Sequence, residues 1–316
     1  MRPKVFIDGH VGTTGLRIRD WLADRTDIEL VVLSEEKRKN DAARRECTLA
    51  ADVTILCLPD TAARTLAESL RDSDARLIDA STAHRVAKDW VYGLPELARG
   101  QRDAIRNAKR VTNPGCYASA FVLMARPLVE FELIADHALL TIHALSGYSG
   151  GGRKLIERWE EGGLLSLPYE APYALGAVHK HIPEMRQYTR LTTEPQFVPA
   201  VGPFRCGMRV ELPLHAGILA RGSGGETIRN VLQQAYGSEP FVRVMALGDA
   251  AKIDEQSLDP RACNDTNRID LHVLQHPSGH VLVVAILDNL GKGAAGVAIQ
   301  NVNLMLGLEE RSGLGA

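Results

Sequence analysis

Short apolar runs alternate with segments of helical spacing along the first third of this 316-residue chain. The apolar runs cover residues 5–7, 28–33, 53–58 and 76–80. Their length is typical of buried strands. Between them, residues 16–22 and 61–71 place apolar side chains at the spacing of a half-buried helix. Strands that alternate with helices over short links predict a parallel α/β sheet.

From residue 138 onward the pattern changes, because strand-length runs follow one another with few helical segments between them. The predicted strands cover residues 138–145, 196–201, 207–214, 241–246, 268–275 and 280–287. One helix, residues 226–236, interrupts them, and a last helix has Ala298, Val302 and Met305 on one face. Long strands with few helices predict a second domain with a mixed or antiparallel sheet.

The composition is that of a globular protein, and the length favours two domains. Lys and Arg number 37 against 39 Asp and Glu, so no global basic field would recruit nucleic acid. No apolar run approaches the ~20 residues of a membrane helix, and the N-terminus lacks a signal-peptide apolar region. Five cysteines without close pairs fit a reducing cytoplasm, and they predict neither a disulfide framework nor a metal site.

The main chemical candidate is Cys116, in the stretch Asn113-Pro114-Gly115-Cys116-Tyr117. A Pro-Gly pair ends one element and a helix-forming run follows, so Cys116 is expected at or just before a helix N-terminus. Unpaired N–H groups and the positive end of the helix dipole favour a thiolate there, which lowers the thiol pKa. The same N–H groups would stabilise an oxyanion. Because most free cysteines are buried and inert, position alone leaves a structural role open.

A glycine-rich turn joins the first predicted strand to the first helix. Gly9, Gly12 and Gly15 are spaced G-x-x-G-x-x-G, so the regular G-x-G-x-x-G fingerprint is not matched. A strand, a glycine turn and a helix can still hold a pyrophosphate, since glycines allow close backbone approach and the helix supplies N–H donors. Thr13 and Thr14 add hydroxyls that can cap the helix or bond phosphate oxygens. The turn indicates nucleotide binding.

The end of the second predicted strand indicates which dinucleotide is bound. It lies at Ser34 rather than at an acidic residue that would bind a 2′-hydroxyl, and a charged loop with Lys37 and Arg38 follows. A hydroxyl beside a cationic cluster suits a 2′-phosphate, so NADP is favoured over NAD, although a solvated loop explains the same residues. Pro59 lies in the turn between the third predicted strand and the next helix. Ser81 follows the fourth strand, at the edge where a doubly wound sheet binds its ligands.

The second half adds a basic loop and two histidines. The glycine-rich loop at residues 146–152 ends in Arg153 and Lys154, which either bind a phosphate or carboxylate or are surface charges that start a helix. His179 and His181 would point the same way in a strand, but they lack the further ligand spacing of a zinc site. An imidazole would instead activate a thiol or move protons.

Seven segments, in order along nearly the whole chain, match one known family. They are residues 9–15, 79–85, 92–97, 113–117, 146–150, 179–184 and 288–303. Together they resemble the short type of N-acetyl-γ-glutamyl-phosphate reductase, an enzyme family of arginine biosynthesis. The Gly-Leu-Pro-Glu-Leu sequence of residues 93–97 and the Asn-Pro-Gly-Cys-Tyr sequence are the most specific matches. Gly291, beside Lys292, departs from the family, where a bulkier residue is expected.

The resemblance implies a Rossmann-type NADP-binding domain, residues 1–115 and 290–316, to which the C-terminal helix returns. It also implies an α+β catalytic and oligomerisation domain, residues 116–289, like that of aspartate-semialdehyde dehydrogenase. The family's nucleophile falls on Cys116, and its histidine pair falls on His179 and His181. The implied protein is a cytoplasmic homodimer or homotetramer that acts on a small molecule.

The residue patterns and the resemblance together give two sets of binding residues. The expected cofactor set is Gly9, Gly12, Thr13, Thr14, Gly15, Ser34, Lys37, Arg38, Pro59, Ser81, Ser146, Gly147 and Asn289. The candidate substrate ligands are Arg85, Asn113, Arg153, Lys154 and Tyr173. NADP is the expected cofactor, and neither a nucleic acid nor a membrane is an expected partner.

The expected reaction is the NADPH-dependent reduction of N-acetyl-L-glutamyl 5-phosphate to the 5-semialdehyde plus phosphate. The Cys116 thiolate would expel phosphate and form a thioester, which receives hydride from NADPH. His179 is the first choice for moving protons, and His181 is the second. Three rivals stay open: a reductase of aspartyl phosphate or a carrier-bound aminoadipyl group, a cysteine hydrolase using Cys116 and His179, and a non-catalytic dinucleotide sensor.

Overall fold

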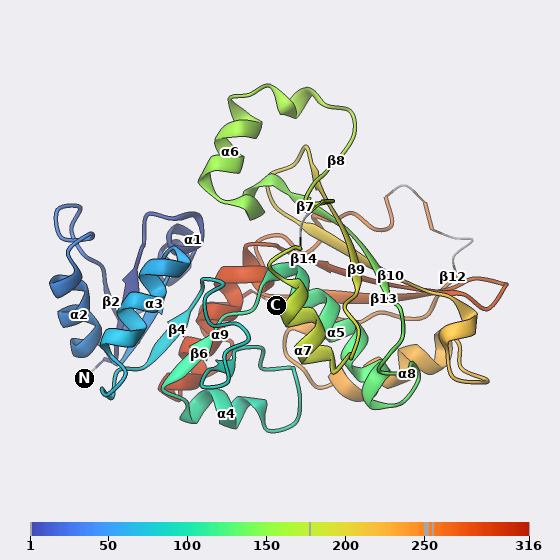
Figure 1. Ribbon diagram of the computed structural model, residues 1–316, viewed down its shortest axis with the longest axis horizontal. Coiled ribbons are helices and arrows are strands. Elements are labelled where there is room, and N and C mark those ends of the chain that lie inside the picture. Colours follow the sequence, from blue (N-terminus) through green and yellow to red (C-terminus); the bar gives the residue numbers. More distant parts are fainter. Residues whose placement is uncertain (1, 177, 250–252, 255, 316) are drawn as a thin grey trace. The chain divides into compact units, whose positions relative to one another are not determined.

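The computed structural model describes residues 2–315 except 177, 250–252 and 255. The chain forms two compact units, which are coloured along the sequence in Figure 1. Unit 1 contains Met1–Pro114 and Ala294–Gly315, and unit 2 contains Gly115–Gly293. The chain therefore passes from unit 1 to unit 2 between Pro114 and Gly115, and it returns to unit 1 after Gly293.

Unit 1 is built on a six-stranded parallel sheet with the order β2-β1-β3-β4-β6-β5. Its strands are β1 (Lys4–Asp8), β2 (Glu29–Val31), β3 (Val53–Leu56), β4 (Leu77–Asp79), β5 (Val91–Tyr92) and β6 (Arg110–Thr112). Its helices are α1 (Thr13–Leu22), α2 (Asp41–Ala50), α3 (Asp60–Ser69), α4 (Gln101–Asn107) and α9 (Gly296–Leu306). The order reverses between β1 and β3, and such a switch point is where a doubly wound sheet binds its ligand.

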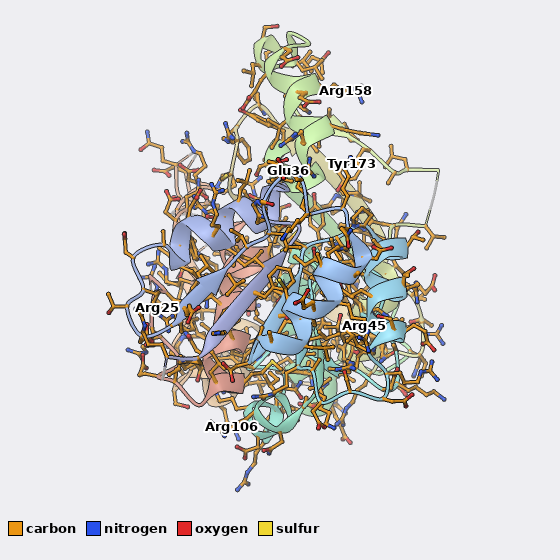
Figure 2. The ribbon with its side chains drawn as sticks, turned by 90° about the vertical axis from the view of Figure 1, so that its left-hand side faces the viewer. Arg25, Glu36, Arg45, Arg106, Arg158 and Tyr173 are labelled. Carbon is orange, nitrogen blue, oxygen red and sulfur yellow. The ribbon has the colours of Figure 1, made fainter. Side chains whose placement is uncertain are left out.

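The apolar runs of unit 1 form its central strands because both of their faces are buried. Every residue of β3 is buried, and so are four of the five residues of β1. One core cluster packs these strands against α1 and α9, with Ile18 and Ile299 fully buried. Figure 2 shows Arg25, which follows α1, and Arg45, on α2, on the two sides of the sheet. The second strand ends at Val31, earlier than its apolar run, and Val32 is exposed.

The described residues of unit 2 form a mixed sheet of eight strands, where the sequence predicts six strands in a mixed or antiparallel sheet. Seven follow the order β11-β13-β14-β10-β7-β9-β8, and β12 pairs with β13. The strands are β7 (Thr141–Gly147), β8 (Ala171–Pro172), β9 (Gln196–Gly202), β10 (Met208–Leu214), β11 (Val242–Val244), β12 (Gly248–Asp249), β13 (Ile269–Gln275) and β14 (Val281–Leu287). Each neighbouring pair among β13, β14, β10 and β7 is antiparallel, whereas β7 and β9 are parallel.

Helix α5 (Cys116–Glu130) is the central helix of unit 2. Twelve of its 15 residues are buried, since it is apolar on all sides and packs against β10 and β14. Helices α7 (Ile182–Thr189) and α8 (Gly225–Tyr236) pack on its two flanks, as Figure 1 shows. Helix α6 (Arg153–Glu160) extends away from the sheet on a small cluster of its own, which contains Tyr148 and Trp159.

Candidate functional site

The glycine turn of unit 1 follows β1, beside the end of β3. Gly9 has a φ of +89°, and a Cβ there would lie 2.3 Å from the Cys57 carbonyl oxygen. A Cβ on Gly15 would lie 2.5 Å from the carbonyl oxygen of Gly9. Both positions therefore require glycine, because any side chain would collide with backbone. The turn leaves bare backbone at the switch point, which fits the close approach of a pyrophosphate.

Helix α1 begins earlier than the apolar spacing predicts. Its first residue is Thr13 rather than Leu16, so Thr13 and Thr14 lie in its first turn. The N-cap is Gly12, which makes no side-chain cap, so neither threonine caps the helix. Their hydroxyls stay candidates for bonding phosphate oxygens at the positive end of the helix dipole.

A buried ion pair supports this turn, and no local sequence pattern indicates it. Asp8, the last residue of β1, is 2% exposed, and its two carboxylate oxygens accept bonds of 3.1 and 2.9 Å from Nε of Arg44. Burial raises the pKa of the Asp8 carboxyl, and the Arg44 guanidinium opposes that shift. Arg44 Nη1 also bonds Asp41 at 3.1 Å. The pair fixes the first turn of α2 to the strand that carries the glycines.

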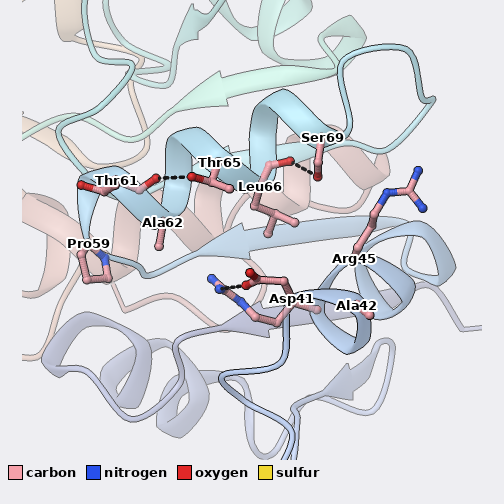
Figure 3. A pocket seen from close by; sticks show the side chains of 10 residues that line it. Asp41, Ala42, Arg45, Pro59, Thr61, Ala62, Thr65, Leu66 and Ser69 are labelled. Atoms are coloured by element: carbon pink, nitrogen blue, oxygen red, sulfur yellow. Dashed lines mark hydrogen bonds and ion pairs between the residues drawn. The ribbon is translucent and has the colours of Figure 1, made fainter.

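A cavity of about 470 Å³ lies between α2 and α3 (Figure 3). Its α3 wall includes Pro59 and Leu66, and its α2 wall includes Arg44 and Arg45. Within the described chain, Nη2 of Arg44 is buried and has no hydrogen-bond partner. An apolar wall faced by guanidinium groups suits a planar base that carries an anionic group nearby. The cavity contains one expected cofactor residue, Pro59.

The loop between β2 and α2 carries the residues expected to bind a 2′-phosphate. The Ser34 carbonyl oxygen accepts bonds from the N–H groups of Lys37 and Arg38 at 3.0 and 2.9 Å. Arg38 forms an ion pair with Glu35 at 2.5 Å, and Ser34 and Lys37 are exposed. The loop is thus a compact turn with its polar side chains at the surface of unit 1.

Ser81 and Arg85 form part of a buried network after β4. The Ser81 hydroxyl donates to Asp79 at 2.9 Å, and Nε of Arg85 donates to the Ser81 carbonyl oxygen at 3.0 Å. Nδ1 of His84 lies 2.6 Å from the same oxygen, Oδ2 of Asp79, and the His84 ring stacks on that of Trp90 with ring centres 4.1 Å apart. These contacts order the end of β4, the strand end at which Ser81 is expected to meet the cofactor.

Asn113 is also held inside unit 1. It is 2% exposed, and its Nδ2 donates to the Ala294 carbonyl oxygen at 2.9 Å. Its Oδ1 lies 3.4 Å from Nδ2 of Asn301 on α9. The side chain therefore ties the end of β6 to the C-terminal segment.

In unit 2, Cys116 is the first residue of α5, which confirms the predicted helix N-terminus. The N-cap is Gly115, with no side-chain cap, and Cys116 is partly exposed. The Gly115 N–H donates to the buried Glu184 carboxylate at 2.9 Å. Glu184 lies in the predicted 179–184 motif, but only the fold reveals this contact between residues 69 positions apart.

Tyrosines and histidines gather beside Cys116. The Tyr173 hydroxyl donates to that of Tyr117 at 3.1 Å and lies 3.5 Å from Nε2 of His179. The rings of His179 and His181 are 4.7 Å apart, and each lies 5.7 Å from that of Tyr117. The structure thus brings together Tyr173 and both predicted histidines at the residue that follows Cys116. The histidines precede α7 in a turn rather than a strand, with His181 as the N-cap.

The phenols and the imidazole of this cluster have defined protonation. Burial raises the pKa of Tyr173 to about 12, and it raises the pKa of Tyr117 well above its usual value. Both phenols therefore remain hydrogen-bond donors at neutral pH. The His181 N–H donates to Nδ1 of His179 at 3.2 Å, so a neutral His179 carries its proton on Nε2.

Three predicted cofactor residues lie in unit 2 rather than unit 1. Ser146 and Gly147 end β7, and a Cβ on Gly147 would lie 2.4 Å from the Arg205 carbonyl oxygen. Asn289 accepts a bond from the Gly207 N–H at 2.8 Å and donates to Ser149 at 2.9 Å. The Asn289 amide therefore holds two loops together. The other ten predicted cofactor residues belong to unit 1.

Arg153 and Lys154 begin α6, and both are exposed. Two cations at a helix N-terminus oppose the helix dipole, so an anion bound there would relieve the repulsion.

The structure explains why residue 291 is a glycine rather than the bulkier residue of the family. A Cβ at this position would lie 2.1 Å from the Thr266 carbonyl oxygen, so the bulkier residue expected from the family does not fit.

Three of the other four cysteines have thiol pKa values that are raised by burial. Burial raises the pKa of the Cys57 thiol to about 12 and that of the Cys263 thiol to about 11, and it also raises the pKa of Cys47. These three therefore stay protonated near neutral pH and are poor nucleophiles. Cys206 lies 3.5 Å from the Ser149 hydroxyl.

The described residues contain neither a membrane-spanning helix nor a group of side chains that could hold a metal ion. No helix there is long and apolar enough to cross a membrane. No group of three or more His, Cys, Asp or Glu in that part of the chain is placed to hold a metal ion.

Family models match both units of the chain. Residues 4–108 match the semialdehyde dehydrogenase NAD-binding domain, and residues 116–289 match the semialdehyde dehydrogenase dimerisation domain. The chain is 46% identical over 308 residues to the N-acetyl-gamma-glutamyl-phosphate reductase of Burkholderia orbicola, covering 96% of this chain and 97% of that one. It is 44% identical over 321 residues to the enzyme of the same name from Trichormus variabilis, covering 99% of each chain.

Solved structures share the fold at low sequence identity. Aspartate semialdehyde dehydrogenase from Francisella tularensis superposes with a TM-score of 0.72 at 17% identity, covering 95% of this chain and 99% of that one. Aspartate semialdehyde dehydrogenase with NADP from Candida albicans gives 0.69 at 17% identity, covering 97% and 99%. These likenesses confirm the predicted pairing of a nucleotide-binding α/β domain with a second α+β domain.

Proposed function

Because the chain belongs to the N-acetyl-gamma-glutamyl-phosphate reductase family of semialdehyde dehydrogenases, we propose that it reduces N-acetyl-L-glutamyl 5-phosphate. The products are N-acetyl-L-glutamate 5-semialdehyde and phosphate, in arginine biosynthesis. The observation that carries the proposal is Cys116 at the uncapped N-terminus of α5, beside a cluster of two tyrosines and two histidines. A thiol in that position is equipped for acyl transfer.

Cys116 acts as the nucleophile. The N-terminus of α5 favours the thiolate, which attacks the acyl carbon, forms a C–S bond and expels phosphate. The resulting thioester accepts hydride, which a carboxylate would not. The first N–H groups of α5 hold the oxyanion that develops on the acyl oxygen in both steps. When the thiohemiacetal collapses, the C–S bond breaks and the thiolate is regenerated.

His179 moves the protons, and His181 is the alternative. Nε2 of His179 carries the proton of the neutral ring and lies beside the Tyr173 hydroxyl. The two phenols remain protonated and fix the imidazole from one side. A positioned imidazole can both accept and donate a proton in a reaction at neutral pH.

NADP is the proposed cofactor, and unit 1 is its proposed binding domain. The glycine turn at the switch point suits the pyrophosphate, and the cavity beside Pro59 suits the adenosine. Lys37, Arg38 and Ser34 lie on the loop that would meet the 2′-phosphate. When bound, NADPH supplies the hydride that reduces the thioester.

The substrate ligands and the assembly are also proposals. Arg153 and Lys154 are exposed cations of unit 2 and would bind the phosphate or the α-carboxylate. Tyr173 would contact the substrate through its cluster with Tyr117. Arg85 and Asn113 stay candidates in unit 1. We propose a cytoplasmic homodimer or homotetramer that associates through unit 2, since the matched family domain there is a dimerisation domain.

The reverse reaction tests the function. NADP, phosphate and N-acetyl-glutamate 5-semialdehyde should give a growing NADPH absorbance, with aspartate semialdehyde and NAD as parallel controls. We expect signal with the acetylated aldehyde and NADP, and none from the Cys116→Ala variant. Absence of signal with either aldehyde, in a protein that binds NADP, would contradict the proposal.

A further inference from the structure

Gly293, the last residue of unit 2 before the chain enters unit 1, packs directly against Cys116. Residues Gly291–Ala295 form a π-helical turn, a rare geometry that is common at functional sites. Gly293 lies in this turn, and its N–H donates to the Asp288 carbonyl oxygen at 3.0 Å. A Cβ on Gly293 would lie 2.6 Å from the Cys116 Cβ and 3.4 Å from its Cα. Non-bonded carbons prefer roughly 3.5–4.0 Å, so only glycine fits.

The collision could not be relieved by a side-chain rotation. The Cys116 Cβ is bonded to the backbone at the first residue of α5, so moving it means moving that turn. The residue before it is held by the bond from the Gly115 N–H to the buried Glu184 carboxylate. The beginning of α5 therefore resists displacement.

The opposing turn is held equally firmly. The fully buried Asp288 carboxylate accepts bonds of 2.9 Å from the N–H groups of Asp265 and Leu290. Lys292, the neighbour of Gly293, is fully buried, and its ammonium lies 5.7 Å from the ring centre of Phe241. A methyl group at position 293 would thus be forced between two fixed pieces of backbone.

We propose that Gly293 is a positioning residue for the reaction. Its bare backbone allows the π-helical turn to fit against the Cys116 Cβ, and this contact sets the direction in which the thiol leaves the first turn of α5. The inference rests on the proposed function only in taking Cys116 as the nucleophile. Because a displacement of about 1 Å can cost roughly 10²-fold in rate, the contact matters for catalysis.

Two glycines supply matched controls. Gly291 is in the same turn, but the three atoms nearest to a Cβ there are the Thr266 carbonyl oxygen at 2.1 Å and two Asp288 side-chain carbons at 2.9 and 3.3 Å, and none belongs to Cys116. A Cβ on Gly176 would meet no atom of the described residues within 4 Å. Gly291→Ala thus disturbs the turn without touching the nucleophile, and Gly176→Ala changes the residue without a collision.

The first experiment compares the three variants by alkylation of Cys116 with iodoacetamide between pH 6 and 10, read by peptide mass spectrometry. We expect Gly293→Ala to lower the alkylation rate about tenfold or to shift its pH midpoint, and to lower kcat about 100-fold. NADPH affinity should change less than twofold. Gly291→Ala should lower the melting temperature but leave the alkylation of the folded protein near wild type, as should Gly176→Ala.

A second experiment uses stability and needs no activity. Cys116→Gly removes the Cβ with which an alanine at 293 would collide. Gly293→Ala should therefore cost less stability in the Cys116→Gly background than in wild type, measured as unfolding midpoints in a double-mutant cycle. If Gly293→Ala alone does not fold, the double variant should.

Either result can overturn the inference. Equal stability losses in both backgrounds would mean that the Cβ contact is not the cause, and so would wild-type alkylation and turnover in Gly293→Ala. Equal losses of alkylation in Gly291→Ala and Gly293→Ala would point to general damage of the turn. Failure of the proposed function is a separate outcome, because wild-type protein would then show no turnover while the alkylation rates and the cycle could still differ.

Discussion

Helices α1 and α5 begin with the same backbone design but carry different chemistry. Both have a glycine N-cap in an extended conformation, Gly12 at φ −75° and ψ 161° and Gly115 at φ −79° and ψ 147°, and neither glycine supplies a side chain that caps the helix. Both first turns therefore present N–H groups to an anion. Helix α1 begins with two threonines, whereas α5 begins with Cys116 beside a tyrosine.

The surroundings of the two helix ends account for the difference. The first turn of α1 is preceded by glycine backbone and by Asp8, which pairs with Arg44. These surroundings suit a ligand that binds without reacting. Aromatic hydroxyls and two imidazoles stand beside the first turn of α5. The dipole gives anion affinity at either end, and proton-transfer groups together with a nucleophile turn one of them into a reactive site.

The largest expected effect is that of Cys116→Ala. It should lower turnover at least about 10⁴-fold, because the two-step covalent route is lost. NADPH binding, measured by fluorescence titration, should stay nearly intact, because the glycine turn belongs to the other unit. A loss of NADPH binding together with turnover would show that the N-termini of α1 and α5 do not have separate roles in binding and reaction.

His179→Asn should have the next largest effect. A lost general acid–base group costs roughly 10²- to 10⁴-fold in kcat. His181→Asn is the matched control, since the two rings are 4.7 Å apart. The measurement is the pH profile of kcat for both variants. A larger loss and a lost ionisation in His181→Asn would transfer the role to His181.

Arg44→Met tests whether the ion pair with Asp8 supports the cofactor site at the N-terminus of α1. It leaves Asp8 as a buried carboxylate without its guanidinium, and breaking such a pair costs about 3–5 kcal/mol of unfolding free energy. Urea denaturation measures this loss. Asp8→Asn combined with Arg44→Met should recover part of it. A NADPH affinity equal to wild type in the folded variant would remove Arg44 from the account of the cofactor site.

Glu184→Ala tests the hydrogen bond that supports the N-terminus of α5 beside Cys116. It leaves the Gly115 N–H without its carboxylate, and an unsatisfied buried donor costs about 1–3 kcal/mol. Glu184→Gln keeps an acceptor oxygen and should lose less. Denaturation midpoints of the two variants measure the difference, and equal losses would show that charge rather than the hydrogen bond matters.

The smallest expected effect concerns alkaline stability. The folded-state pKa of Tyr173, about 12, exceeds its ordinary value of 10.0, so the folded state prefers the neutral phenol. The associated stability is fully present below pH 10 and is lost as the pH rises through 12. Tyr173→Phe should flatten this part of a stability–pH curve. A curve for Tyr173→Phe that falls as steeply as wild type would place the titration elsewhere.

Local pattern predicted much of the fold. The strand beginning near residue 5 and that beginning at residue 53 were predictable because their apolar runs are buried on both faces. Helix α2 was missed since its sequence is rich in charge and only Arg44 and Thr48 are buried, so no apolar stripe marks it. Strand β6 was missed because it has three residues, of which Arg110 is the first.

The candidate site likewise combines a feature that local sequence predicts with contacts that only the fold creates. Cys116 was predictable, because Pro-Gly followed by a helix-forming run is a local signal for a helix N-terminus. The contacts of Glu184 with Gly115 and of Gly293 with Cys116 join residues far apart in sequence, and no local pattern encodes them. The spacing of the two histidines suggests a strand, but α7 begins at Ile182 with Pro183 in its first turn, so the histidines lie in the turn that precedes the helix.

The central claim is that Cys116 carries the acyl group, and the most direct test omits the hydride donor. Protein mixed with N-acetyl-L-glutamyl 5-phosphate without NADPH should release one equivalent of phosphate in a burst, and peptide mass spectrometry should find the acyl group on Cys116. Adding NADPH should then discharge it as the semialdehyde. No burst in a protein that turns over with NADPH, or an acyl group on another residue, would contradict the account.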